Sequence, residues 1–208
     1  MYSLPYFKEQ DSAVVLQFIK EHPFAFLCGA DDGGKPVATQ VPVFIDECEG
    51  KLLLTGHIMR NTDHHKAFEQ NPHVLAVFSG AHSYVSPSWY ENPQQGGTWN
   101  YMSVHAKGIL KFLNETALLE VLRRTTNHFE NNPHSPANFE HLPQDYVQRL
   151  IKAIVAFEIE VTEMDNVFKL SQNRDEKSYH NIIHQLNEQK GDGAVIAEEM
   201  QKRLTKLF

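Results

Sequence analysis

Short apolar runs alternate with turn-forming residues along the first half of the chain. The run at 24–28 precedes a turn at 31–35 that holds two Asp and two Gly residues, and the runs 37–45 and 51–55 flank a second turn at 46–50. Short turns of this kind join antiparallel strands, whereas parallel strands need a crossover of a dozen or more residues. The pattern therefore predicts an antiparallel meander of three strands.

Three later segments also have strand character: 74–78, 101–112 and 154–161, with a short extended piece at 168–171. Positions 157–161 alternate apolar and acidic side chains, as a strand with one buried face does. Together with the meander, these segments predict six or seven mostly antiparallel strands, closed or nearly closed as a β-barrel. Strands that follow turns rather than crossover helices argue against a doubly wound parallel fold.

Apolar residues recur at helical spacing between and after these strands. The first helix is predicted to start at Asp11, a suitable N-cap, and to end at Pro23. The fold class that we expect is thus mainly β, an antiparallel barrel with inserted helices and a helical C-terminal tail. The other predicted helices cover 61–70, 114–130, a segment that opens at Pro143, and a tail at 175–207 that is interrupted at 191–193.

Charge and composition narrow the classes of function. The 208 residues carry 19 Lys and Arg against 26 Asp and Glu, a net charge of -7. Because cationic side chains supply most non-specific affinity for nucleic acid, this balance and the lack of a basic recognition helix give no support to DNA contact. The N-terminus has no signal-peptide pattern and no apolar run is long enough to span a membrane, so we expect a cytoplasmic protein without membrane contact. Cys28 and Cys48 are predicted to be free, buried thiols.

The sequence lacks several familiar catalytic motifs. It contains no G-x-S-x-G, no Walker A loop, no G-x-G-x-x-G after a strand and no H-E-x-x-H. These absences argue against a classical nucleotide-binding fold and against a serine hydrolase.

The densest polar segment is 55–66, where a predicted strand leads into a predicted helix. Arg60 can bind a phosphate in bidentate fashion, Thr62 or Asn61 can cap the helix, and Lys66 adds a further cation. Free N–H groups at a helix start attract anions, so the segment is a candidate phosphate subsite. A solvated, capped surface helix is an equally good explanation, and a metal site of His57, His64 and His65 is a third.

Two further segments are candidates for ligand binding. Both tryptophans, Trp89 and Trp99, lie near tyrosines and hydroxyl side chains, which suits a flat conjugated ligand but also suits a subunit interface. The polar string 169–174 follows the last predicted strand. A solvated helix entry explains this string equally well.

Several strings in the chain resemble the PaiB family. They are Met1-Tyr2 with Pro5 and Phe7, His22-Pro23-Phe24-Ala25, Gly56-His57, Ser86-Pro87-Ser88-Trp89-Tyr90, Thr98-Trp99-Asn100-Tyr101 with Val104-His105 and Gly108, and Lys169-Leu170-Ser171-Gln172-Asn173. They occur in the family's order from Met1 to about Gln189. The resemblance implies an FMN-binding homodimer with the flavin split barrel of pyridoxamine phosphate oxidases, and FMN at the dimer interface.

The resemblance also implies which residues hold FMN. The phosphate position corresponds to Thr62 and His64, with Arg60 and Lys66 as further cations. The second strand would line the ring edge through its backbone, while Trp99 and Asn100 close the site from the other subunit. Lys169 and Gln172 would lie near the ring or the phosphate. The complete expected set is Thr39, Gln40, Val41, Pro42, His57, Arg60, Asn61, Thr62, His64, Lys66, Trp99, Asn100, Lys169 and Gln172.

On this basis we expect residues 1–173 to form the FMN-binding split-barrel domain with helical insertions, and 174–208 a helical extension. The family's role implies a negative transcriptional regulator. An FMN-dependent oxidoreductase acting on a small molecule is the alternative, with His57 and His105 as candidate acid–base groups. A third hypothesis is a barrel that binds no flavin and serves as an interaction module, so the sequence leaves open whether the protein is an enzyme.

Overall fold

The computed structural model describes residues 1–2 and 4–208. Six strands form a closed barrel in the order β1-β2-β3-β6-β5-β4. The pairs β1–β2, β1–β4, β2–β3 and β3–β6 are all antiparallel. The predicted antiparallel barrel is therefore confirmed. The strands are β1 (Phe24–Ala30), β2 (Pro36–Cys48), β3 (Lys51–Met59), β4 (His73–Val85), β5 (Thr98–Phe112) and β6 (Ile154–Lys169).

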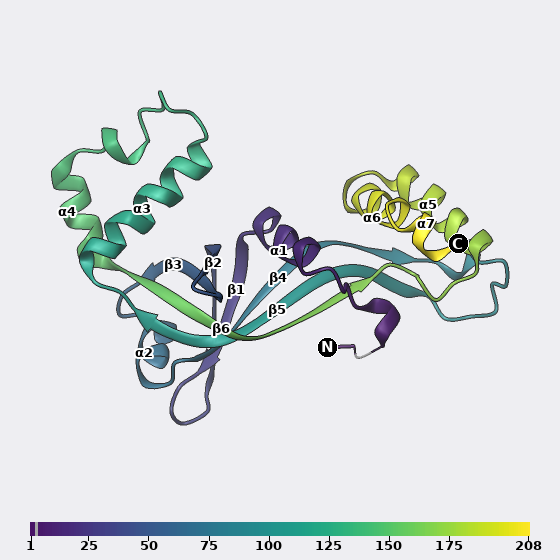
Figure 1. Cartoon of the computed structure of the whole chain (residues 1–208), viewed down its shortest axis with the longest axis horizontal. Helices are drawn as coiled ribbons and strands as arrows, with labels where there is room; N and C mark the ends of the chain where they lie inside the picture. The colour runs from purple at the N-terminus through teal and green to yellow at the C-terminus, as the bar shows by residue number, and fades with distance from the viewer. Residues whose placement is uncertain (3) are drawn as a thin grey trace. The chain divides into compact units, whose positions relative to one another are not determined.

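Seven α-helices and three short 3-10 helices complete the described part of the chain (Figure 1). Every predicted helix is found, and the predicted tail is divided into three. The α-helices are α1 (Ser12–Glu21), α2 (Asp63–Gln70), α3 (Glu115–Glu130), α4 (Gln144–Ala153), α5 (Glu176–Gln189), α6 (Gly191–Gln201) and α7 (Leu204–Leu207); the 3-10 helices are η1 (Pro5–Phe7), η2 (Pro87–Trp89) and η3 (Phe139–His141).

The chain divides into two compact units. Unit 1 comprises residues 1–18, 79–104 and 165–208, and unit 2 comprises residues 19–78 and 105–164. Strands β4, β5 and β6 each supply residues to both units. The expected domain boundary between residues 173 and 174 stays a prediction.

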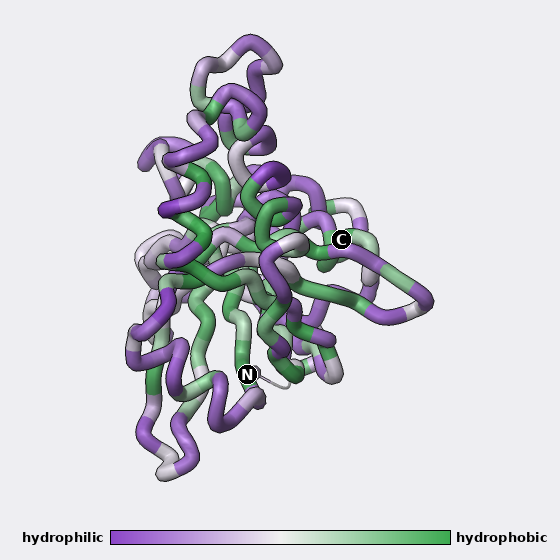
Figure 2. The backbone as a smooth tube through the Cα atoms, turned by 90° about the vertical axis from the view of Figure 1, so that its left-hand side faces the viewer, coloured by the Kyte–Doolittle hydropathy of each residue, from purple (hydrophilic) through white to green (hydrophobic). Residues whose placement is uncertain are grey.

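In unit 2 the strands alternate between the barrel interior and its outer face. On β1, Ala25 and Leu27 are fully buried, whereas Phe24 and Phe26 are 59% and 45% exposed. Figure 2 shows hydrophobic stretches along the strands and hydrophilic residues at the connecting turns. The alternation follows from the pleat of a strand, which sends successive side chains to opposite faces.

The hairpin between β2 and β3 has a two-residue loop. Cys48 pairs with Lys51, and the intervening Glu49 and Gly50 have φ of 52° and 76°. Two positive φ values match the twist of the flanking strands. Cys48 ends β2 beside this turn, and its side chain is exposed. The side chain of Cys28, on β1, is half-buried. Both thiols are free as expected, but the prediction that they are buried is wrong.

Helices α3 and α4 of unit 2 pack together over part of β6 (Figure 1). Asn114 caps α3 by accepting a hydrogen bond from the Ala117 N–H at 3.0 Å. Apolar residues spaced three and four apart give each helix one buried stripe. The resulting cluster contains Leu118, Val121, Leu122, Val147, Ile151, Ile154 and Ala156.

The C-terminal helices belong to unit 1. Tyr179 on α5 is fully buried and donates its hydroxyl to the Met200 carbonyl of α6 at 3.0 Å. Lys190 and Gly191 have φ of 61° and 52°, which breaks the helical path between α5 and α6. The predicted interruption of the tail is thus confirmed, one residue earlier than expected.

Candidate functional site

The fourteen residues expected to hold the cofactor lie in two groups, one in each unit. Ten belong to unit 2, on β2 and around the β3–α2 corner, and four belong to unit 1. Each group is described by itself. The unit 1 group is Trp99, Asn100, Lys169 and Gln172, and the unit 2 group is Thr39, Gln40, Val41, Pro42, His57, Arg60, Asn61, Thr62, His64 and Lys66.

The expected ring-binding segment of β2 has a free backbone edge. Thr39, Gln40 and Val41 pair with Leu27, Phe26 and Ala25 of β1. The pairing of β2 with β3 begins only at Val43, so no strand of the described chain covers the other edge of 39–41. Unpaired backbone groups need a partner such as water or a ligand. This edge can therefore hydrogen-bond the polar rim of a flat ligand.

The β3–α2 corner is built by local hydrogen bonds. Asn61 has a left-handed φ of 63°, and Thr62 caps α2 by accepting from the His65 N–H at 3.2 Å. The Thr62 hydroxyl also donates to the Met59 carbonyl at 3.1 Å. Arg60 donates its Nε–H to the Ile154 carbonyl at 2.9 Å, which leaves its two terminal nitrogens for another acceptor. The cap and the tethered arginine fix where this corner presents charge.

Both signs of charge lie at the start of α2. Lys66 is exposed and forms no ion pair in the described residues, whereas Asp63 accepts from the His64 N–H at 2.8 Å and lies 3.1 Å from His64 Nδ1. The bond to the His64 N–H lowers the pKa of the Asp63 carboxyl. Arg60 and Lys66 therefore outnumber the Asp63 carboxylate at the helix start, while Glu69 lies 3.7 Å from His65 further along α2, and this donor set fits a phosphate.

His57 lies on β3 with a buried, unpartnered ring nitrogen. Its Nδ1 has no hydrogen-bond partner within the described chain, and burial lowers the pKa of the imidazole. His57 pairs with Ala156, which belongs to the α3–α4 cluster, so its ring shares that face of the sheet. The structure thus offers a histidine that is neutral at pH 7.

Asn100 and Trp99 in unit 1 have opposite surroundings. Trp99 is 53% exposed, and its ring lies 5.9 Å from His82 and 6.0 Å from Tyr84. Asn100 is fully buried, accepts from the Ser171 hydroxyl at 3.0 Å and donates to the Met200 sulfur at 3.5 Å. Trp99 is therefore open to a ligand, whereas the Asn100 amide is already used inside unit 1.

The string 169–174 forms a tight turn in unit 1. Ser171 has a left-handed φ of 62°, and the Arg174 N–H donates to its carbonyl at 3.0 Å. Gln172 accepts from the Leu170 N–H at 2.7 Å and donates to the Phe168 carbonyl. Gln172 thus stabilises the turn that carries Lys169 and Arg174.

Lys169 lies against neutral groups. Its ammonium donates to the Thr98 hydroxyl and, at 2.9 Å, to the Trp99 carbonyl, and it lies 5.9 Å from the Phe7 ring. Burial, with a smaller effect of the Arg174 charge, lowers its pKa. Arg174 and Tyr90 are not among the fourteen expected residues, although they lie in the strings 169–174 and 86–90.

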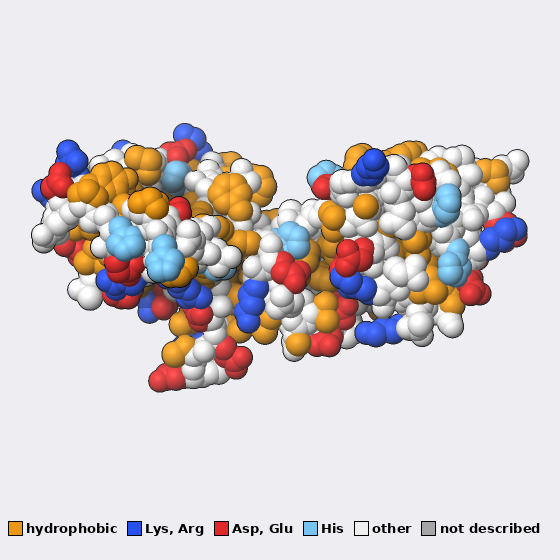
Figure 3. Space-filling model, turned by 90° about the horizontal axis from the view of Figure 1, so that it is seen from above, with side chains coloured by type: hydrophobic (Ala, Val, Ile, Leu, Met, Phe, Trp, Pro, Cys, Tyr) orange, Lys and Arg blue, Asp and Glu red, His pale blue; other side chains and the backbone are white. Residues whose placement is uncertain are grey.

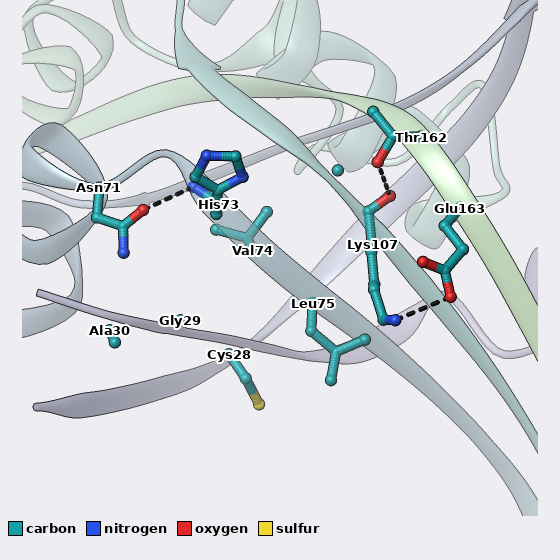
Figure 4. A pocket seen from close by; sticks show the side chains of 11 residues that line it. Cys28, Gly29, Ala30, Asn71, His73, Val74, Leu75, Lys107, Thr162 and Glu163 are labelled. Carbon is teal, nitrogen blue, oxygen red and sulfur yellow. Dashed lines mark hydrogen bonds and ion pairs between the residues drawn. The ribbon is translucent and has the colours of Figure 1, made fainter. Parts of the chain in front are cut away.

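Two hollows in unit 2 lie apart from the predicted residues. The larger, of about 490 Å³, is lined by Cys28, Leu75, His73 and the Lys107–Glu163 ion pair, whose atoms lie 2.8 Å apart (Figure 4). The smaller, of about 340 Å³, lies beside Phe44. Burial raises the pKa of the Cys28 thiol, so it is not an activated nucleophile. None of the fourteen predicted residues lines either hollow.

The described residues contain neither a metal-binding cluster nor a membrane-spanning helix. No group of three or more His, Cys, Asp or Glu side chains there could hold a metal ion, so His57, His64 and His65 do not form one. No helix of the described chain is long and apolar enough to cross a membrane. On the face shown in Figure 3, Lys and Arg side chains lie among Asp and Glu rather than in one continuous basic area.

The barrel defines the class of protein. The structure is similar to the flavocytochrome Anf3 from Azotobacter vinelandii, with a TM-score of 0.57 and 16% identity over 81% of this chain and 72% of that one. It is also similar to the FAD and heme binding protein from Mycobacterium smegmatis, with a TM-score of 0.57 and 13% identity over 78% and 73% of the two chains. At these identities the likeness shows the fold alone, a split barrel that these proteins share with this chain.

The family follows from the sequence. The model described as "Putative FMN-binding domain" matches residues 1–163, and the chain belongs to this family. The chain is 33% identical over 207 residues to "Protease synthase and sporulation protein PAI 2" of Bacillus subtilis (strain 168), covering 99% of both proteins. The resemblance to the PaiB family is confirmed.

Proposed function

We propose that this protein is an FMN-binding homodimer with a regulatory role in transcription. The observation that carries the proposal is the family match over residues 1–163, joined to a donor set that suits a flavin phosphate. Arg60 and Lys66, with Thr62 and His64 beside them, would hold the phosphate, and the free edge of 39–41 would hold the ring's polar rim. A bound flavin supplies reversible one- and two-electron redox chemistry.

The four expected residues of unit 1 are proposed as further flavin contacts. Trp99 is exposed enough to cover a flat ring, and Lys169 and Gln172 stay predicted neighbours of the flavin. The buried amide of Asn100 is bonded to Ser171 and Met200, so we propose that Asn100 acts by holding its own strand in place. In unit 2, Pro42, Asn61 and His57 are proposed as further contacts, because Pro42 follows 39–41 on β2 and the other two lie on β3 and at the β3–α2 corner.

The outer face of β1 supports the dimer. Phe24 and Phe26 are exposed there, and Phe26 lies between Gln40 of β2 and Val77 of β4. Large apolar side chains gathered on one sheet face are typical of an interaction surface. We propose that a second copy of the chain covers this face.

The regulatory role comes from the relative's name and from the family. The net charge of -7 speaks against an extended basic surface for DNA, so we propose that regulation follows the flavin state of the dimer. The second candidate is an FMN-dependent oxidoreductase, and the specific observation in its favour is His57. A buried, neutral imidazole with an unused nitrogen can exchange protons with a substrate.

A flavin titration tests the proposal. The purified protein should bind FMN and show the absorbance of an oxidised flavin, and Arg60→Ala with Lys66→Ala should weaken FMN binding about tenfold or more, because a phosphate dianion loses its charged partners. The double variant Lys35→Ala with Lys152→Ala removes the same charge from exposed positions of unit 2 and should leave binding unchanged. Since Arg60 also bonds to Ile154, thermal unfolding of each variant is measured alongside, and Lys66→Ala alone is titrated as well.

Four outcomes would decide between the hypotheses. A colourless monomer that takes up no FMN would contradict the flavin-binding dimer, and unchanged affinity in the Arg60 and Lys66 variants would contradict the placement of the phosphate. Reduction of the bound flavin by a nicotinamide cofactor would favour the oxidoreductase. Retention of a specific promoter fragment at physiological salt would favour direct regulation.

A further inference from the structure

Two buried polar atoms of unit 1 lack a partner at the same place. Tyr90 is only 5% exposed, and its hydroxyl has no hydrogen-bond partner of good geometry within the described chain. The same holds for Nε of Arg174, whose guanidinium lies 4.0 Å from the centre of the Tyr90 ring. A buried polar group without a hydrogen-bond partner destabilises the folded protein. Two neighbouring donors without an acceptor therefore indicate that an acceptor from outside the chain belongs there.

The two cations of this turn have only neutral partners. Arg174 donates to the Gln95 side-chain carbonyl, and Lys169 donates to the Thr98 hydroxyl and the Trp99 carbonyl. Both side chains thus reach the same short segment, 95–99. Neither forms an ion pair in the described residues, which is unusual for half-buried charges. Their charge is left for a ligand.

The nearby carboxylates are engaged elsewhere. Glu91 pairs with Lys177 at 2.9 Å, and Asp175 caps α5 by accepting from the Ser178 N–H at 2.8 Å and from its hydroxyl at 2.7 Å. Burial raises the pKa of the Tyr90 hydroxyl, which therefore stays protonated and able to donate at neutral pH. Neither of these carboxylates supplies the missing negative charge.

We infer that Tyr90, Lys169 and Arg174 form an oxyanion subsite in unit 1 that takes the carboxylate or phosphate group of a small molecule. Arginine and tyrosine donate to the oxyanion, and the lysine adds charge from the other end of the turn. The left-handed Ser171, held by Asn100, sets the turn that carries both cations. This inference goes beyond flavin binding, because it concerns unit 1 in the flavin-free protein. The oxyanion can come from a separate acid or from the flavin's own phosphate, since the two share this chemistry.

Inorganic phosphate is the probe that tests the subsite. Calorimetric titration of the flavin-free protein in chloride buffer should detect binding, and Lys169→Met with Arg174→Gln should weaken it about tenfold or more. Lys177→Met is the matched control, because it removes an exposed cation of unit 1 that already has a carboxylate partner. The Arg60 and Lys66 double variant should keep this binding, which separates the subsite from the proposed flavin phosphate position.

Tyr90→Phe keeps the test valid if the double variant fails to fold. Because the Tyr90 hydroxyl has no hydrogen-bond partner of good geometry in the described chain, its removal should leave the phosphate-free melting temperature unchanged or slightly higher. The rise in melting temperature on adding phosphate should shrink. A Tyr90→Phe variant that loses stability without phosphate but keeps the full phosphate effect would overturn the inference.

Repeating the titration with FMN-loaded protein separates the two sources. Undiminished phosphate binding would assign the subsite to a separate acid, and displacement of phosphate by FMN would assign it to the flavin. Phosphate binding that is lost in the Arg60 and Lys66 variant but unchanged in the Lys169 and Arg174 variant would overturn the inference, whatever the outcome for FMN. Failure of FMN to bind would contradict the proposed function but would not contradict the oxyanion subsite.

Discussion

At the scale of single residues, burial decides which side chains carry unusual chemistry. His57 and His65 both have a pKa below the usual value, and in both the main cause is desolvation of the charged imidazole. The unfolded chain binds a proton on such a histidine at about pH 6.5, whereas the folded chain resists it. These histidines therefore couple the stability of the protein to pH.

We expect the free energy of unfolding to fall between pH 7 and pH 5. Below about pH 6.5 the unfolded state binds more protons than the folded state, so acid favours unfolding. His57→Gln should make this decrease shallower, and the exposed His134→Gln should leave it unchanged. Denaturant unfolding at pH 7, 6 and 5 measures the three slopes.

The Asp165 carboxyl acts mainly below this window. The Lys8 ammonium holds the pKa of Asp165 below its usual value, so that pair loses its contribution only as the pH falls below about 4. An identical slope for the wild type and the His57→Gln variant would show that His57 is not protonated preferentially in the unfolded state.

At the scale of elements, turns and caps position the chemistry. The β2–β3 loop needs two residues with positive φ, and the chain places Glu49 where Asn or Gly is preferred. The α2 start needs a cap, and Thr62 supplies it while Asn61 takes the left-handed position before it. The backbone at Glu49 is therefore strained, whereas Asn61 is a residue type that tolerates a left-handed conformation.

Replacing Glu49 by Asn should stabilise the protein by up to about 1 kcal/mol, because Asn adopts a left-handed backbone at less cost. Denaturant unfolding at pH 7 measures the difference. Glu47→Asn makes the same chemical change at a paired position of β2 and should give no gain. Equal effects of the two substitutions would mean that backbone strain at Glu49 is not relieved.

At the scale of the whole molecule, the exposed apolar face of β1 leads us to expect that a second copy of the chain covers it. We expect the wild-type protein to elute with about twice the mass of its 23.8 kDa chain. Phe26→Ser should shift this species toward a monomer, since it removes an exposed aromatic ring from the proposed interface. Light scattering after gel filtration measures both masses.

The matched control for the dimer is Phe129→Ser. Phe129 is 54% exposed in unit 2 and lies on α3, where its ring is 6.4 Å from that of Phe44 on β2, so the variant tests the loss of an exposed aromatic ring outside β1. This variant should keep the dimer mass. A wild-type monomer at micromolar concentration, or equal effects of both substitutions, would refute the proposed interface.

The amino-acid sequence by itself determined the features that depend on neighbouring residues. Alternating positions gave the strands, Asp11 and Asn114 gave helix starts, and the ordered motifs gave the family. These signals are local, because pleat, helical spacing and capping act over a few residues. The apolar runs predicted β4 and β6 to be shorter than they are. Both strands continue through polar residues, because a strand is held by backbone hydrogen bonds that do not require apolar side chains.

Only the tertiary structure decided which distant side chains lie together and which polar groups remain unsatisfied. The residues around Tyr90 in the sequence do not predict that Arg174 covers its ring, or that the Tyr90 hydroxyl and Arg174 Nε lack an acceptor in the described chain. Likewise, Asn100 belongs to a motif, yet only its contacts with Ser171 and Met200 show that its amide is used inside the chain. Burial and partnership depend on contacts between residues far apart in the chain, and residue type alone does not specify them.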